Sequence, residues 1–488
     1  MMNNILNGWI VLQIITVAFF FGVQEVKAQQ HAKTKRPNIV FFLVDDMGWK
    51  DMGAFGSELY ETPNMDKLCG DGVRFTNAYT SAPICSPARA SVLSGRHPLS
   101  LRMWHAPHYI RKEDSKQLLP RLLKDVGYST WHVGKWHLGN PEDKTMPTDV
   151  GFDINIGGAI SWDPGSYFWP YKCDEKGKSV GHPRAFVPLR KGGKQGEQIT
   201  DRLTDEALKL INNKKSAEPF YLNMWYYSVH NALGKKQAKP ELIHKYKKKI
   251  KDLGLKETYR TYLGDSLLTS ETNATYAAML ETVDNSVGRI VNALKKKGLY
   301  ENTLFVFYSD NGPTTNDVPC DPLWGGKNTT YEAGVRMPAF ITWNGNIKGN
   351  KKSKERIIIM DVFNTILDAA LVDLPLEYRG DGISLLPLLK EGESVPKRNF
   401  YWFFPDNRRK WGGRSSAAMM NKEGWKYIYF FTGDEPELYN INDDMEELHN
   451  ELQKYPGKAS KLGNKLAEFL AKNGYSKMKM GRSKKNNN

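Results

Sequence analysis

Cysteine is scarce in this sequence. Among 488 residues there are only four, at Cys69, Cys85, Cys173 and Cys320. A disulfide scaffold is excluded, because such scaffolds support small secreted domains that cannot build a sufficient core. If Cys85 is chemically modified, the other three cysteines allow at most one disulfide. The hydrophobic content of 40% and the aromatic content of 12% instead predict a large apolar core.

Long hydrophobic runs are also lacking. The one stretch worth considering as a membrane span is Ile10 to Phe21, which is shorter than the roughly 20 apolar residues that a span requires. Val26-Lys27-Ala28 follows it and offers small residues for cleavage before Gln29. We therefore predict a signal peptide over residues 1–28 and an exported protein, periplasmic or secreted. A membrane anchor is the alternative interpretation, and we expect no stable anchor.

Acidic residues are outnumbered by basic ones, 54 to 69, which gives a formal net charge of +15. The basic residues gather in Lys235–Lys256, Lys295–Lys297, Lys348–Arg356 and the tail 476–488. We interpret these runs as solvated helix faces and a disordered tail. The alternative is a surface field that attracts a polyanion. Nucleic acid is not an expected partner, because the sequence has no motif of the nucleic-acid-binding classes.

Apolar runs of strand length alternate with helical patterns. Four runs are expected to form buried parallel strands: Asn38–Val44, Tyr128–Val133, Phe220–Tyr226 and Thr303–Ser309. Helical spacing of apolar residues predicts three helices between them: Ser115–Asp125, Thr200–Asn213 and Thr275–Lys297. The sequence has no internal repeat with a period of about 20 to 50 residues, so a solenoid or propeller is not expected. We predict an α/β fold over residues 36–395, with a doubly wound, mostly parallel central sheet flanked by helices.

After residue 395 the alternation of strand and helix patterns ends. Short aromatic runs at Phe400–Phe404, Trp425–Phe431 and Glu437–Ile441 are separated by turn residues, and Gly457–Lys472 has a helical pattern. This pattern predicts a small C-terminal subdomain over residues 396–475, made of an antiparallel sheet and one packing helix.

Two oxygen-rich pairs follow predicted strands directly. Asp45-Asp46 comes after the first strand, and Asp310-Asn311 comes after the strand that ends at Ser309. Open α/β sheets bind ligands at the carboxyl ends of their strands. Four oxygen ligands suit Ca²⁺ or Mg²⁺ rather than Zn²⁺, which prefers nitrogen and sulfur. An Asp-Asp pair taken alone is also common in turns and helix caps.

Several motifs resemble one enzyme family. Cys85-Ser86-Pro87-Ala88-Arg89, continued by Leu93 and Gly95-Arg96, resembles the C-x-P-x-R signature of type I sulfatases, in the alkaline phosphatase superfamily. Further blocks follow in the family's order: Gly134-Lys135-Trp136-His137-Leu138-Gly139, Gly325-Gly326-Lys327 with Tyr331–Pro338, and Asp381–Leu389. The resemblance spans about Arg36 to Glu451.

The resemblance implies a modified nucleophile and a metal ion. In the family, the signature cysteine is oxidised by a maturation enzyme to formylglycine (3-oxoalanine), whose hydrated form attacks the sulfur of a sulfate ester. Cys85 occupies that position here. The implied cofactor is one Ca²⁺ ion, with these residues as its ligand region: Asp45, Asp46, Cys85, Asp310 and Asn311.

The resemblance also implies roles for the basic side chains. Lys135, Lys327 and Arg89 would neutralise sulfate oxygens, and Arg89 would in addition tie the modified residue to its helix. His137 would bind the formylglycine diol and assist its turnover. His230 would protonate the leaving alcohol, although Asn231-Ala232 follows it where the family usually has a proline. We expect Arg336 to pair with a carboxylate rather than to touch substrate.

The substrate is less constrained. The sequence looks like that of a bacterial polysaccharide sulfatase, so a sulfated algal polysaccharide of the ulvan or carrageenan type is the first expectation, and glycosaminoglycan or aryl sulfates come second. Trp162–Tyr171 and Arg408–Arg414 are candidate sugar subsites or simple core segments. Two other functions stay open: a phosphodiesterase or phosphonate hydrolase of the same superfamily, and a non-catalytic polysaccharide-binding protein if Cys85 is not oxidised.

Overall fold

The computed structural model describes residues 36–475 except 107–108, 172–188, 190–191, 216, 231–236, 263–264, 315–317, 376 and 407–413. The predicted signal peptide, Cys173, the basic tail and nearly all of the Arg408–Arg414 segment lie outside the described residues. Cys69 and Cys320 are both free thiols. No helix in the described part of the chain combines the length and the apolar character that crossing a membrane requires.

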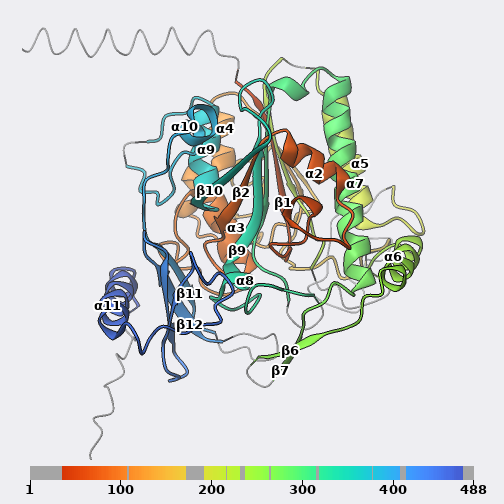
Figure 1. The fold of residues 1–488 in the computed structure, drawn as a ribbon. Helices are drawn as coiled ribbons and strands as arrows, with labels where there is room; N and C mark the ends of the chain where they lie inside the picture. The colour runs from red at the N-terminus through yellow and green to blue at the C-terminus, as the bar shows by residue number, and fades with distance from the viewer. Residues whose placement is uncertain are drawn as a thin grey trace, which may run out of the picture.

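An eight-stranded sheet forms the centre of the described molecule (Figure 1). Its strands lie in the order β10 (Lys351–Ile358), β2 (Val73–Tyr79), β9 (Arg336–Thr342), β8 (Thr303–Ser309), β1 (Asn38–Val44), β5 (Phe220–Trp225), β3 (Ser129–Gly134) and β4 (Ile154–Ile156). Strand β9 is antiparallel to both of its neighbours, and the other neighbouring pairs are parallel. The predicted mostly parallel α/β sheet is confirmed.

Strand β1 lies in the middle of the sheet and is buried on both faces. All seven of its residues are buried. Val40, Phe42 and Val44 pack into one core cluster, whereas Ile39 and Phe41 pack into the other. This alternation explains why the strand has a continuous apolar sequence: each face needs its own apolar residues.

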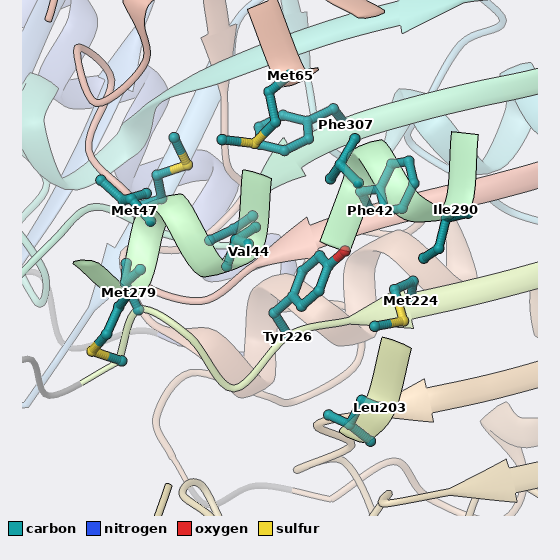
Figure 2. Packing of buried hydrophobic residues seen from close by; sticks show 14 of the residues in the cluster. Phe42, Val44, Met47, Met65, Leu203, Met224, Tyr226, Met279, Ile290 and Phe307 are labelled. Atoms are coloured by element: carbon teal, nitrogen blue, oxygen red, sulfur yellow. The ribbon is translucent and has the colours of Figure 1, made fainter. Parts of the chain in front are cut away.

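Helices cover both faces of the sheet (Figure 1). One face packs against α2 (Pro63–Gly70), α5 (Ile199–Asn213) and α7 (Ala274–Lys296), with α6 (Pro240–Asp252) beside α7. Figure 2 shows this cluster, which contains Phe42 and Val44 from the sheet together with Met65, Leu203 and Met279 from the helices. The other face packs against α3 (Cys85–Ser94), α4 (Leu119–Asp125), α9 (Asp361–Ala369) and α10 (Leu386–Glu391).

The predicted helices are confirmed with one exception. Helix α7 begins after Asn273, whose side chain accepts hydrogen bonds from the N–H groups of Thr275 and Tyr276 as an N-cap. The single helix expected over Ser115–Asp125 is wrong. A 3₁₀ turn, η2 (Asp114–Gln117), precedes α4, and Leu118 between them is extended. Pro120 is tolerated in the first turn of α4 but not in the interior of one continuous helix from Ser115, because it lacks an N–H and its ring clashes with the preceding turn.

A second, four-stranded antiparallel sheet follows in the chain. Its strands lie in the order β11 (Phe400–Phe404), β12 (Ser416–Met420), β13 (Trp425–Phe430) and β14 (Glu437–Asn440). Helix α11 (Pro456–Lys472) packs on this sheet through Leu462, Leu466 and Leu470. The predicted antiparallel sheet and packing helix are confirmed. The remaining short elements are η1 (Gly53–Phe55), η3 (Tyr300–Asn302), α8 (Glu332–Val335) and the hairpin of β6 (Tyr259–Tyr262) with β7 (Asp265–Leu268).

A buried ion network joins the two sheets. The Lys426 ammonium of β13 lies 2.9 Å from Glu332 of α8 and 2.9 Å from Glu447, and all three side chains are inaccessible or nearly so. The Trp402 indole donates a hydrogen bond to the Thr80 carbonyl at 2.7 Å. Because these contacts are buried, the second sheet is fixed against the first. A domain boundary at residue 395 stays a prediction.

Candidate active site

The predicted polar motifs meet at one edge of the central sheet. Asp45 and Asp310 follow β1 and β8, Lys135 follows β3, and His230 follows β5 by a short loop. Since these strands are parallel, their carboxyl ends lie at the same edge. Backbone hydrogen bonds fix the loops to one another: the Asp310 N–H donates to the Val44 carbonyl, and the Asp45 N–H donates to that of Ser228.

Three carboxylates form the centre of the site. Asp45, Asp46 and Asp310 are all buried, and each offers an oxygen within 4.8 Å of the others. Burial raises the pKa of Asp45, and Lys135 only partly opposes that shift. Burial would raise the pKa of Asp310 too, but Arg89, together with other cations, outweighs it and holds that pKa below its ordinary value.

This donor set fits an oxygen-liganded divalent cation. Asn311 donates through Nδ2 to Asp46 Oδ1 at 2.6 Å, which leaves its own oxygen available. Within the described residues, Asn311 Oδ1 and Asp45 Oδ1 are buried and accept no hydrogen bond. Buried oxygens without donors are costly unless a ligand satisfies them. Carboxylate and amide oxygens are ligands that Ca²⁺ and Mg²⁺ accept.

Three buried cations surround the carboxylates. Lys135 Nζ lies 2.6 Å from Asp45 Oδ2, and Lys327 Nζ lies 2.6 Å from Asp46 Oδ1. Arg89 pairs with Asp310 through Nε at 2.8 Å and Nη2 at 2.7 Å. The three positive charges match the three carboxylates, so the buried charges are paired, as their burial requires.

Arg89 faces the carboxylates in this structure. Its guanidinium is fully buried, lies over the Trp225 ring at 5.1 Å, and donates to the Lys135 carbonyl at 3.3 Å. Arg89 thus contacts Asp310, Asp45 (Nη2 to Oδ1, 3.5 Å) and the loop after β3. Contact with a sulfate oxygen or with residue 85 remains a prediction for this side chain.

Cys85 is the first residue of α3 and is buried. Its Sγ lies 3.3 Å from Nδ1 of His137, and the neighbouring Ser86 hydroxyl donates to the His137 carbonyl at 2.9 Å. Burial raises the pKa of the Cys85 thiol, although Lys135 and Lys327 oppose the shift. The N-terminus of α3 adds a partial positive charge beside this residue. The two lysines and the helix N-terminus therefore favour negative charge at this position, and burial of the side chain opposes it.

Both candidate histidines are buried, and burial lowers the pKa of each. Burial, and then the charge of Lys135, hold the pKa of His137 well below its ordinary value. Burial and Lys327 do the same to the pKa of His230, whose Nε2 lies 3.7 Å from Asp46 Oδ2. Within the described residues, His137 Nε2 and His230 Nδ1 are buried without hydrogen-bond partners. A bound ester can use these nitrogens without displacing an existing bond.

The loops that carry the site are held in unusual backbone conformations. Asp46 has φ 60° and His137 has φ 57°, in the left-handed region that non-glycine residues seldom adopt. Gly134 has φ 110°, and a Cβ there would meet the Trp225 carbonyl oxygen at 1.8 Å. Only glycine therefore allows the Lys135 loop to approach β5 this closely. Such strain persists where surrounding contacts enforce it, as at functional sites.

Some residues that contact the site were not predicted from the sequence. Ala106 and Phe404 pack with Cys85 in one small apolar cluster, so the second sheet covers the candidate nucleophile. No motif indicated that contact. Arg336 donates to Glu332 Oε2 at 2.7 Å, as expected for a residue that holds its loop.

The aromatic residues of the candidate sugar segment Trp162–Tyr171 differ in their contacts. Tyr167 donates to the carbonyls of Tyr227 and His230, and Tyr171 donates to Glu197, so both phenols support the fold. Trp162 is only half-buried, and its ring centroid lies 6.5 Å from that of His137. Within this segment, Trp162 is the aromatic side chain that the structure brings to the site.

The chain matches known proteins over nearly its whole described length. The family described as Sulfatase matches residues 37–372, and the family described as N-sulphoglucosamine sulphohydrolase, C-terminal, matches residues 322–473. N-acetylgalactosamine-6-sulfatase of Mus musculus is 33% identical over 394 residues, which cover 75% of this chain and 68% of that protein. A sulfatase of Formosa agariphila is 28% identical, with coverage of 90% and 89%.

Solved structures agree with this relationship. The crystal structure of Ps i-CgsB in complex with k-i-k-neocarrahexaose has a TM-score of 0.73 and 27% identity, and the match covers 91% of this chain and 94% of that one. The phosphonate monoester hydrolase of Agrobacterium radiobacter, at 20% identity and a TM-score of 0.63, shares the fold. The fold and the arrangement of the site define a hydrolase of the alkaline phosphatase superfamily. Within it, the chain belongs to the sulfatase family, whose members are sulfuric ester hydrolases.

Proposed function

We propose that this sulfatase hydrolyses sulfate esters of a sulfated carbohydrate, and that residue 85 acts as formylglycine with a bound calcium ion. The observation that carries the proposal is the contact of Cys85 Sγ with His137 Nδ1 at 3.3 Å, beside three buried carboxylates and three buried cations. Formylglycine supplies a geminal diol, whose second hydroxyl allows sulfate to be released after the ester is cleaved.

Asp45, Asp46, Asp310 and Asn311 are the residues that would hold the calcium ion. When bound, the ion supplies positive charge against the oxygens of the nucleophile and of the sulfate group. Lys135 and Lys327, whose ammonium groups pair with Asp45 and Asp46 in this structure, then become available to sulfate oxygens. Arg89 keeps Asp310 oriented through a charge-assisted hydrogen bond from Nε and an ion-pair contact from Nη2, both to Oδ2.

The histidines would move the protons of the reaction. His137, in contact with residue 85, is placed to take a proton from the nucleophile, because its lowered pKa favours the neutral imidazole. His230 lies on the Asp46 side of the site and is our candidate for the group that protonates the leaving alcohol. To do so it must carry a proton, which the negative charge of a bound sulfate group would favour by raising its pKa. Tyr167 holds its backbone by donating to the His230 carbonyl at 2.8 Å.

The two histidine roles can be separated with two substrates. His230→Ala is expected to slow hydrolysis of alkyl and sugar sulfates by about 10²–10⁴-fold, the usual worth of general acid catalysis. Sulfates of acidic phenols should be affected far less, since their leaving oxygen needs little protonation. Rates for both substrate types on the same enzyme preparation give the measurement.

His137→Ala is the matched control for this experiment. It should slow both substrate types alike, because it acts on residue 85 rather than on the leaving group. Equal losses on both substrates for His230→Ala would show that the acid has been assigned to the wrong residue.

A carbohydrate substrate is supported by Trp162 and by the relatives. A half-buried tryptophan beside His137 can stack on a sugar ring that carries the ester. One relative is named for N-acetylgalactosamine 6-sulfate, and one structural neighbour was solved with a neocarrahexaose. We therefore propose an algal polysaccharide of the ulvan or carrageenan type, or its oligosaccharides, as the first substrate class. Glycosaminoglycan and aryl sulfates are the second.

The other proposed functions have less support. A phosphodiesterase or phosphonate hydrolase with two metal ions needs more ligands than the single cluster of three carboxylates found among the described residues. A non-catalytic polysaccharide-binding protein requires that Cys85 remain a thiol. Export through the predicted signal peptide and oxidation by a maturation enzyme are part of the proposal, on the sequence alone.

A further inference from the structure

A basic groove lies away from the active site, between the edge of the central sheet and the C-terminal sheet. It consists of two adjoining hollows of about 390 and 790 Å³, which share Lys397, Arg398 and Lys422. Glu355 and Glu423 are the acidic residues that line it. No residue proposed for the active site lines either hollow. We call this feature the cationic groove.

Most charges of the cationic groove are unpaired in the described chain, although Arg398 pairs with Asp361 and Lys422 with Glu423. Within the described residues, Lys352, Lys354 and Lys397 of the first hollow make no ion pair, and the same holds for Lys461 and Lys465 of the second. In the basic run Lys235–Lys256, by contrast, several lysines form ion pairs. On α6, Lys245 pairs with Glu61 and Glu281, and Lys248 pairs with Asp252. The groove therefore keeps a positive field that the α6 lysines partly lose to neighbouring carboxylates.

Protection of a sheet edge explains only part of this charge. Strand β10 is an edge strand, and lysines such as Lys352 and Lys354 discourage pairing with another chain. Helix α11 has no such edge to protect. Its Lys458, Lys461 and Lys465 nevertheless recur at helical spacing on the side that lines the second hollow. Segments that are distant in the sequence therefore contribute cations to one concave surface.

We propose that the cationic groove binds a chain of the sulfated polysaccharide at a distance from the active site. This inference rests on the proposed carbohydrate substrate. A groove of closely spaced ammonium groups attracts a polyanion and gains affinity as bound counterions are released. A polymer held there brings its other sulfate esters to the active site at a raised effective concentration.

The groove fits a sulfated glycan better than other polyanions. Binding of single-stranded nucleic acid uses open aromatic faces, but Lys458 Nζ lies 3.4 Å from the centroid of Trp425 and covers that ring. Anionic membranes are flat and favour exposed apolar anchors. None of the large exposed apolar residues of the described chain, among them Leu253 and Leu448, lines the groove.

The test compares two triple variants of the full mature chain. K458E/K461E/K465E removes cations from the groove, and K247E/K251E/K256E makes the same charge change at exposed lysines on or next to α6. In a Cys85→Ala background, which prevents turnover, each is titrated with fluorescein-labelled carrageenan. The groove variant should lose at least about tenfold in affinity and show a shallower salt dependence, as three ionic contacts are lost. The α6 variant should stay within about twofold of the parent.

The same variants with Cys85 intact serve as the catalytic control. Both should hydrolyse a small aryl sulfate as the parent does, while the groove variant alone shows a raised KM for the polymer. If a glutamate variant loses aryl sulfatase activity, the corresponding lysine-to-glutamine triple replaces it. Because binding is measured without turnover, an inactive parent enzyme would contradict the proposed function and leave the binding result standing.

Three results would overturn the inference. Equal affinity losses in the groove and α6 variants would show that net charge, rather than the groove, binds the polymer. Equal binding of desulfated carrageenan would remove the role of sulfate. Binding of DNA or of phosphatidylglycerol vesicles at least as tight as that of carrageenan, and equally sensitive to the groove variant, would assign the groove to another partner.

Discussion

Cys85→Ala is expected to lower turnover of an aryl sulfate by at least about 10⁴-fold, as removal of a covalent nucleophile does in other hydrolases. Alanine has no group that can be oxidised to the aldehyde, and no neighbouring side chain can replace it. The fold should persist, because the Cys85 side chain is small and packs with Ala82, Ile84, Ala106 and Phe404. Initial rates and the melting temperature of the purified variant give the measurement.

Cys320→Ala is the matched control, since this thiol is free and takes no part in the site. It should retain activity close to that of the parent. Near-parental turnover in Cys85→Ala itself would contradict the formylglycine mechanism. Loss of the melting transition would mean only that this variant fails to fold. In that case Cys85→Ser, which keeps the size of the side chain, replaces it.

Removal of divalent metal is expected to abolish most of the activity, and Ca²⁺ should restore it better than Zn²⁺. The donor set explains the preference, because Asp45, Asp46, Asp310 and Asn311 offer only oxygen. Calcium should also raise the melting temperature, since a ligand at 100 times its Kd stabilises the folded state by about 2.7 kcal/mol. Chelation followed by calcium titration measures both effects.

Asp310→Asn tests whether the stabilisation arises at this site. The variant should lose the calcium-dependent rise in melting temperature, while Asp321→Asn, at a half-buried carboxyl outside the cluster, should keep it. Full activity in a verified metal-free preparation, or rescue by Zn²⁺ alone, would refute the calcium assignment.

The parts of the fold that were predictable have a strong local signal. Strands β1 and β8 are continuous apolar runs because helices bury both of their faces. Helix α7 combines a side-chain N-cap at Asn273 with a long amphipathic pattern. In contrast, β12 has the sequence Ser-Ala-Ala-Met-Met, whose small and flexible residues have little strand preference of their own. Its pairing with β11 and β13 decides its structure.

The candidate site was predictable in its members but not in all of its contacts. Pairs of oxygen-bearing residues directly after apolar strands predict a site at the sheet edge, so Asp45 and Asp310 could be identified from the sequence. The partner of Arg89 could not, since Asp310 lies 221 positions away and no pattern links them. The contact of Phe404 with Cys85 and the cationic groove could not be predicted for the same reason. Tertiary packing brings both together from distant segments of the chain.

The mass of the peptide that contains residue 85 tests the central claim most directly. The protein should be produced in a host with a formylglycine-generating enzyme, digested, and analysed without reduction or alkylation. We expect the peptide to have lost one sulfur and two hydrogens and gained one oxygen relative to the cysteine form, with the converted fraction matching the fraction of active enzyme. Full activity in a preparation whose residue 85 is entirely unmodified cysteine would contradict the account.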